Sequence, residues 1–359
     1  MKEKYTVVGI MSGTSMDGTD LACCEFEWKE GAWKYQILAG TTIPYNEQWR
    51  VRISQLPQQN AENYHKTHVF YGRYLGILVR DFLREHQLPC DFIASHGHTI
   101  FHRPDLAYTA QIGEGASIQA LSGLPVVCDF RSTDLALHGQ GAPLVPIGDQ
   151  LLFKDYEACL NLGGICNISY QQEGKTVAFD IAPCNIVLNR IARWMGETFD
   201  KDGEIAASAS VDVELLAELN ELPYYSYQGS KSLGREWINE EFWPIVKMYQ
   251  DISEAEKMAT LNDHIARQIA KVVNDAGLRN ILVTGGGAFN TTLLNNLKKY
   301  TTATIVIPES NLVNYKEALI FAFLGVLRVR NEINVLKSVT GSRQNHVAGA
   351  LYGNFSLLI

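Results

Sequence analysis

The chain has 359 residues, of which 46% are hydrophobic, enough for one large domain or two smaller ones. Its formal net charge of −8 lacks the basic excess of proteins that follow a phosphate backbone, so we expect no nucleic-acid partner. No apolar run reaches the roughly 18 to 20 residues of a membrane span, the apolar run near the start is too short for a signal peptide, and the seven cysteines include no Cys-x-x-Cys pair. We therefore expect a cytoplasmic protein without a membrane partner.

The first part of the chain alternates strand-like runs with one helical pattern. Strands are indicated by β-branched, aromatic and small apolar residues, the helix by apolar side chains at helical spacing, and a loop by Gly and Pro without a period. In chain order we expect strands at 5–11 and 20–28, a helix at 60–86, strands at 90–99 and 124–130, and a long loop at 131–146.

The second part repeats this organisation. It predicts three strands between 157 and 181, helices at 185–195, 211–221 and 253–276, a strand and three glycines before a further helix at 280–297, a strand at 302–309 and a helix at 315–330. Both parts open with a glycine-bearing strand-turn-strand, at 6–28 and 158–170. We therefore expect a mixed α/β protein with two similar domains facing a cleft.

Three glycine-bearing turns are candidates for phosphate binding, because glycine lets backbone N–H groups converge on phosphate oxygens. The first, SGTSMDG (12–18), adds three hydroxyl side chains and Asp17 as a possible magnesium contact, although taken alone it fits a plain hairpin equally well. NLGGICN (161–167) and TGGGAFN (284–290) shift the balance toward a nucleotide held between two domains.

Several charged side chains stand at positions suited to chemistry. Asp180 ends an apolar strand, where a carboxylate is either a general base or the cap of the helix that begins near Asn185. Arg131 and Asp134 precede the long loop, where the guanidinium suits a carboxylate ligand and a solvated surface pair is the alternative. Glu317 begins an apolar helix, either as a first-turn charge on the helix dipole or as a cleft residue. The stretch GSKSLGRE (229–236) is a further candidate.

The stretch SHGHTIFH raises the question of a metal site, because it contains His96, His98 and His102. Its spacing fits no common zinc pattern. We favour hydrogen bonds to a polar substrate over zinc, and a structural role is open for His102.

Taken together, these stretches resemble the anhydro-N-acetylmuramic acid kinases, a branch of the hexokinase, Hsp70 and actin superfamily. The resemblance runs nearly end to end. It is carried, in the family's order, by GIMSGTSMDGTD, SHGHT, DFRSTDLALHGQGAPLVP, NLGGICNIS, FDIAPCN, FDKDGEIAA, KSLGRE, TGGGAFN, EALIFAFL and SVTG.

The resemblance implies two actin-like (ribonuclease H-like) domains, each with a mixed sheet flanked by helices, around a central ATP cleft. The expected domains are 1–130 and 131–344, with the tail 345–359 packing back on the first. ATP and its phosphates are expected at Gly13, Thr14, Ser15, Met16, Asp17, Gly18, Thr19, Asp20, Gly163, Gly164, Gly285, Gly286 and Gly287, with Mg²⁺ at Asp17, directly or through water. The sugar is expected at Ser12, His96, Arg131, Asp134, Asn185 and Glu317.

The implied reaction hydrolyses the 1,6-anhydro bond of anhydro-N-acetylmuramic acid while O6 is phosphorylated by ATP, a step of peptidoglycan recycling. Asp180 matches the family's catalytic aspartate, which takes a proton from the water that attacks C1. The family suggests a homodimer. Alternatives are a kinase of a related amino sugar and a catalytically impaired nucleotide-binding regulatory homologue.

The chain departs from the family's usual residues near Asp180 and in the long loop. Ile181, Ala182 and Cys184 stand where Thr, Gly and Gly are usual, and His138 replaces a Gly. We expect the base to survive these changes and the sugar contacts to be the part affected.

Overall fold

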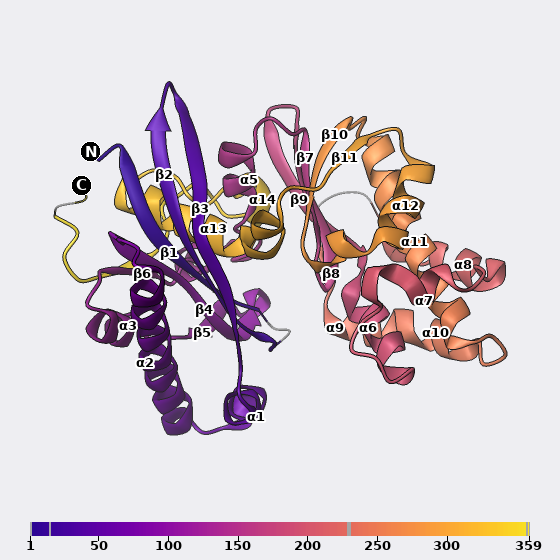
Figure 1. Cartoon of the computed structure of the whole chain (residues 1–359), viewed down its shortest axis with the longest axis horizontal. Coiled ribbons are helices and arrows are strands. Elements are labelled where there is room, and N and C mark those ends of the chain that lie inside the picture. The colour runs from indigo at the N-terminus through magenta and orange to yellow at the C-terminus, as the bar shows by residue number, and fades with distance from the viewer. Residues whose placement is uncertain (1, 14–15, 228–230, 357, 359) are drawn as a thin grey trace. The chain divides into compact units, whose positions relative to one another are not determined.

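A computed structural model describes residues 2–13, 16–227, 231–356 and 358 (Figure 1). The chain forms two compact units, which we describe separately. The first unit comprises Met1–Leu152 and Tyr315–Ile359, and the second comprises Phe153–Asn314. Residues 131–152 and 315–344 thus group with the N-terminal part, whereas the sequence analysis assigned them to the second domain. Among the described residues, no helix is both long enough and apolar enough to cross a membrane.

The first unit is built on a mixed seven-stranded sheet in the order β12-β6-β4-β1-β2-β3, with β5 paired to β4. The strand β1 is antiparallel to β2 and parallel to β4, and β12 from the end of the chain is antiparallel to β6. The strands are β1 (Lys4–Ser12), β2 (Gly18–Lys29), β3 (Ala32–Pro44), β4 (Phe92–Arg103), β5 (Tyr108–Ile112), β6 (Val126–Cys128) and β12 (Ala350–Tyr352).

Helices with buried apolar residues pack around this sheet. The long helix α2 (Ala61–His86) begins at its cap Asn60 and packs Tyr71, Leu75 and Val79 into the core beneath the sheet. The other helices are α1 (Glu47–Gln55), α3 (Gly115–Ser122), α4 (Ser132–Ala136), α5 (Pro146–Leu152), α13 (Ser310–Val329), which enters this unit at Tyr315, and α14 (Lys337–Thr340).

The second unit has a five-stranded sheet in the order β11-β10-β7-β8-β9. Its strands are β7 (Ala158–Leu162), β8 (Ile165–Gln172), β9 (Lys175–Pro183), β10 (Asn280–Thr284) and β11 (Thr304–Val306). Its main helices are α6 (Asn185–Trp194), α7 (Glu204–Ala207), α8 (Val213–Asn220), α9 (Arg235–Trp237), α10 (Trp243–Met248), α11 (Glu254–Asp275) and α12 (Thr291–Tyr300). The helix α11 lies at the centre of the helical layer in Figure 1 and contacts α6, α8 and α12.

The expected α/β class, with a mixed sheet and flanking helices in each half, is confirmed. Every strand and helix predicted with a clear period is present, including the three consecutive strands β7, β8 and β9. The predicted long loop instead contains α4. The elements that were not predicted also include β3, β5, β12, α1, α3, α5, α7, α9, α10 and α14. The edge strand β3 escaped detection because most of its residues are half-buried, so its sequence does not alternate cleanly.

Candidate active site

The residues predicted from the sequence fall into both units. The first unit holds the turn at 12–20, His96, Arg131, Asp134 and Glu317, and the second holds the two other glycine turns, Asp180 and Asn185. Within the first turn, the predicted phosphate contacts Thr14 and Ser15 lie outside the described residues.

The turn at 12–20 joins the paired strands β1 and β2. It closes through a hydrogen bond from Met16 N to Gly13 O at 3.3 Å, and Met16 has a positive φ of 60°. Gly18 is required by packing, since a Cβ there would lie 2.4 Å from the carbonyl oxygen of Ile43. Asp17 is exposed at the tip, as a group that meets a ligand should be.

A buried network of hydroxyl groups anchors this turn from beneath. The Ser12 hydroxyl bonds His98 Nδ1 at 2.7 Å and also the hydroxyls of Tyr45 and Tyr71, and Thr19 lies 3.3 Å from both tyrosine oxygens. All five side chains are buried. Burial lowers the pKa of His98 to about 4, so its ring is neutral at neutral pH. The Ser12 and Thr19 side chains, predicted to touch ligands, therefore face the protein interior.

Sequence reasoning missed Tyr45 and Tyr71. Tyr71 is part of the apolar stripe of α2, so its periodic position predicts core and conceals its hydroxyl. The sequence signal that could have indicated this network was His98, because a buried imidazole needs hydroxyl or carbonyl partners for its ring nitrogens.

Arg131 is held by His96. The imidazole donates from Nδ1 to Gly97 O at 2.9 Å and accepts at Nε2 from Arg131 Nη2 at 2.8 Å, so both ring nitrogens have partners. Burial and the arginine charge hold the pKa of His96 well below its usual range, which keeps Nε2 an acceptor. Arg131 also donates from Nη1 to Gly141 O, which leaves one N–H on each terminal nitrogen for a ligand.

An acidic group lies around Glu317, near the start of the part of α13 that belongs to the first unit. Burial raises the pKa of Glu317, and the charge of Asp20 raises it further. The positive charges of Lys316 and Arg131 lower this pKa and offset part of the rise. Burial likewise raises the pKa of Asp20, with a contribution from Asp17. Carboxylates that disfavour each other's ionisation suit a bound cation. No cluster of three His, Cys, Asp or Glu able to hold a metal unaided occurs in the described part of the chain.

In the second unit, Asn185 ties the two glycine turns together. Its Nδ2 donates to Leu162 O at 2.9 Å and its backbone N–H donates to Gly163 O at 3.1 Å, at the turn between β7 and β8. A Cβ on Gly287 would lie 2.7 Å from Leu162 Cβ and 3.3 Å from Asn185 Oδ1. Only glycine therefore lets the 285–287 segment lie this close to Leu162 at the turn between β7 and β8.

Asp180 lies at the end of β9, where the strand departs from regular pairing. Asp180 pairs with Asn167 and Ala182 pairs with Cys166, so Ile181 is an extra residue that forms a β-bulge. Bulges re-aim the neighbouring side chains and are common beside active sites. The Asp180 side chain is partly exposed, and its backbone is held by Tyr224 OH donating to Asp180 O at 2.7 Å.

The KSLGRE stretch holds the carboxylate of Asp180. Ser232 Oγ donates to Oδ2 at 3.1 Å and Leu233 N donates to the same oxygen at 2.8 Å. Within the described residues, Oδ1 receives no such bond. Burial raises the pKa of Asp180, and these two donors partly offset the rise. One oxygen is thus fixed in place while the other is available to accept a proton.

The chain as a whole is similar to known proteins. A family model described as "Anhydro-N-acetylmuramic acid kinase" matches residues 5–354. Proteins of that name from Hydrogenovibrio crunogenus and Shewanella loihica are 30% and 33% identical, over 96% and 97% of this chain and 97% and 99% of their own length. Component A of the Acidaminococcus fermentans (R)-2-hydroxyglutaryl-CoA dehydratase superposes with a TM-score of 0.46 at 12% identity, covering 89% of this chain and 96% of its own.

Proposed function

Because this chain belongs to the anhydro-N-acetylmuramic acid kinase family, we propose that it hydrolyses the 1,6-anhydro bond of that sugar and transfers the γ-phosphoryl group of ATP to O6, giving N-acetylmuramic acid 6-phosphate and ADP. The observation that carries the proposal is the carboxylate of Asp180, with Oδ2 held by Ser232 and Leu233. The matched family supplies the substrates, and this carboxylate supplies the base that the reaction needs.

Asp180 acts first in the proposed mechanism. Its Oδ1 accepts a proton from the water that attacks C1 of the sugar, and its raised pKa makes it a better proton acceptor than an exposed aspartate. As the C1–O6 bond breaks, its electron pair stays on O6, which attacks the γ-phosphorus of ATP. The charge that develops on O6 passes to the phosphoryl group, so no separate acid is required, and the protein contributes positioning and neutralisation.

The other predicted residues divide between the reactants. The turn at 13–20 and the glycines at 163–164 and 285–287 offer backbone N–H groups to ATP. Arg131, with its remaining N–H groups, binds the lactyl carboxylate of the sugar, and Glu317 lies on the sugar side. Burial lowers the pKa of Arg131 to about 10, which leaves it charged at neutral pH.

Magnesium fits the carboxylates near Glu317, because the charge of Asp20 raises the pKa of Glu317 and the charge of Asp17 raises the pKa of Asp20. Mg²⁺ is usually held by one or two carboxylates together with substrate phosphates, and Asp17 would provide such a carboxylate here. The ion would neutralise phosphate charge when bound. All seven cysteines are free, which supports a reducing, cytoplasmic location, and the family resemblance supports a homodimer.

A product assay tests this function. The protein is incubated with ATP, magnesium and anhydro-N-acetylmuramic acid in ¹⁸O-labelled water, as wild type and as Asp180→Asn. We expect 6-phosphorylated N-acetylmuramic acid with the label at C1, and a loss of turnover of at least about 10³-fold in the variant, since an amide accepts no proton. The exposed Asp251→Asn serves as the matched control and should retain activity.

Three outcomes would contradict the proposal. Unimpaired turnover by Asp180→Asn would remove Asp180 from its role. Phosphorylation of a different amino sugar in preference to the anhydro sugar, or ATP binding without any turnover, would assign the protein to another activity.

A further inference from the structure

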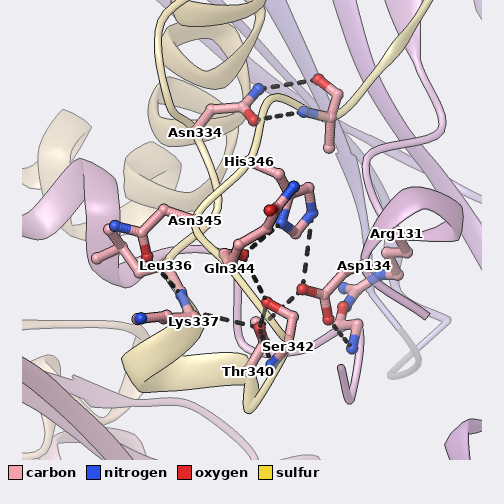
Figure 2. A network of polar contacts seen from close by, with 12 residues as sticks. Arg131, Asp134, Asn334, Leu336, Lys337, Thr340, Ser342, Gln344, Asn345 and His346 are labelled. Atoms are coloured by element: carbon pink, nitrogen blue, oxygen red, sulfur yellow. Dashed lines mark hydrogen bonds and ion pairs between the residues drawn. The ribbon is translucent and has the colours of Figure 1, made fainter. Parts of the chain in front are cut away.

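Asp134 is a carboxylate that has no surface left for a substrate. It lies on α4, one helical turn after Arg131, and it is fully buried. Its Oδ2 accepts a hydrogen bond from Gly141 N at 2.7 Å, and its Oδ1 accepts one from Thr340 Oγ1 at 2.7 Å (Figure 2). His346 Nε2 lies 3.6 Å from Oδ1. The sugar contact expected from the sequence therefore has no free oxygen at this residue.

Gly141 connects Asp134 to Arg131. Its N–H donates to Asp134 and its carbonyl oxygen accepts from Arg131 Nη1, so one residue joins the two side chains. The loop is packed tightly here: a Cβ on Gly139 would lie 2.1 Å from Asp134 Oδ2. Gly141 has a positive φ of 69°, which glycine adopts readily, and its N–H is held by the Asp134 carboxylate. The place of the guanidinium is therefore set through Asp134.

Asp134 is in turn held by a segment that lies more than two hundred residues after it in the sequence. We name residues 337–346 the C-terminal clasp. Three of its bonds reach the 134–140 region: Thr340 Oγ1 to Asp134, Gln140 N to Thr340 O at 2.8 Å, and Arg343 N to Leu137 O at 3.1 Å.

The clasp is itself a closed loop. Val335 and His346 pair as an antiparallel bridge at its base, and Lys337 N donates to Asn345 Oδ1 at 2.9 Å across it. Next to the bridge along the chain, the buried Asn334 side chain accepts from Ala348 N at 2.7 Å and donates to Ala348 O at 2.9 Å, at the top of Figure 2. The Thr340 hydroxyl is thus presented by a fixed backbone.

We propose that Asp134 and Thr340 are positioning residues for Arg131, and that the C-terminal clasp sets the affinity for the carboxylate of the sugar. This inference rests on the proposed function, because it takes Arg131 as the group that binds that carboxylate. Asp134 itself does not touch the substrate.

Steady-state kinetics of Thr340→Val test the inference. Valine has nearly the shape of threonine but cannot donate to Asp134, so Gly141 and Arg131 lose their fixed position. We expect KM for anhydro-N-acetylmuramic acid to rise on the order of tenfold with kcat nearly unchanged, the size of one lost hydrogen bond to a charged group. The anhydro sugar that lacks the lactyl group should show no change in KM. Thr340→Ser keeps the hydroxyl and should restore the wild-type KM, and Thr340→Ala replaces the valine variant should that variant not fold.

A second measurement does not depend on turnover. The Arg131 Nε–H resonance, assigned by its absence in Arg131→Lys, should shift and exchange faster in Thr340→Val than in Thr340→Ser. The inference would be overturned if Thr340→Val raised KM equally for both sugars, or if it changed neither KM nor the Arg131 resonance. In either case, turnover by the wild-type protein would leave the proposed function standing. Wild-type protein without turnover would instead contradict the proposed function, and the resonance would still decide whether the clasp positions Arg131.

Discussion

At the scale of single residues, the candidate site side chains divide into those that keep hydrogen-bonding positions open and those whose polar atoms are bonded within the protein. Asp180 and Arg131 keep free acceptor or donor positions, whereas His96, Ser12 and Asp134 have their polar atoms occupied within the protein. The departures from the family's usual residues beside Asp180 are also explained at this scale. Ile181, Ala182 and Cys184 are buried in the hydrophobic core of the second unit. Since these residues pack against the core, their direct effect falls on packing.

Ser232→Ala is expected to shift the pH dependence of turnover. The serine hydroxyl favours the ionised form of Asp180, so its removal raises the pKa of Asp180 further. A base is lost as the pH falls through its pKa, so the acidic limb of the kcat/KM profile should move to higher pH, by up to about one unit. Ser226→Ala removes an exposed serine whose hydroxyl donates to Pro223 O, and it is the control. A shift in the control alone, or in neither variant, would contradict the assigned bond.

At the scale of elements, the contact between β1 and α13 shows how the sheet places Glu317. A Cβ on Gly9 would lie 1.9 Å from Ala318 O, so the strand and the helix touch through their backbones. The helix continues with buried apolar residues through Val329, and its first turns in this unit hold Lys316 in an ion pair with Asp149 at 2.7 Å. Because Gly9 in the middle of β1 has no side chain, α13, which carries Glu317, can pack directly against the strand.

Gly9→Ala is expected to destabilise the protein strongly. The added methyl group clashes with a backbone carbonyl that cannot move alone, so we expect a loss of about 3 kcal/mol or more in the free energy of unfolding, measured in urea. The control Gly31→Ala places its Cβ where nothing lies within 4 Å and should cost only about 1 kcal/mol, for its positive φ. Similar losses for both variants would contradict the tight strand–helix contact.

Periodicity and glycine patterns predicted most elements and the positions of the glycine turns, because those signals are local. The helix at 60–86 and the turns at 163–164 and 285–287 are examples. The roles of Asp134 and His96 were not predictable, because each depends on partners brought in by the fold: Thr340 lies 206 positions from Asp134, and Arg131 lies 35 positions from His96. Ser232 was within a stretch noted from the sequence, but only the structure identifies it as the partner of Asp180.

At the scale of the whole molecule, each unit contains a buried histidine that resists protonation. Burial lowers the pKa of His98 in the first unit to about 4 and that of His264 in the second unit to about 3. His264 bonds Asn220 Oδ1 at 2.8 Å and Tyr225 OH at 2.9 Å. Both rings take up protons near pH 6.5 when the chain unfolds, so the stability they confer above that pH is lost as the pH falls toward the folded values.

The melting temperature is therefore expected to fall between pH 6.5 and 4.5. Each such histidine contributes about 1.4 kcal/mol per pH unit in that window, and the smaller upward shifts of Asp20, Asp180 and Glu317 act in the opposite direction. His264→Gln should flatten the slope, whereas His65→Gln, at an exposed position on α2, should not. If the melting temperature of the wild type did not change with pH, or if it fell equally steeply in both variants, the buried histidines would not be the cause of the pH dependence.

The division of the chain into units has a consequence for its biosynthesis. The second unit is one continuous segment, Phe153–Asn314, whereas the first is completed only when α13, the C-terminal clasp and β12 join its sheet. Domains usually fold in the order in which they leave the ribosome. Here that order is reversed: the later segment can fold as soon as it emerges, while the sheet that begins with β1 is completed only after β12 has been translated. Arg131, whose carbonyl partner Gly141 is held through Asp134 by the C-terminal clasp, thus reaches its final position only after the clasp has been translated.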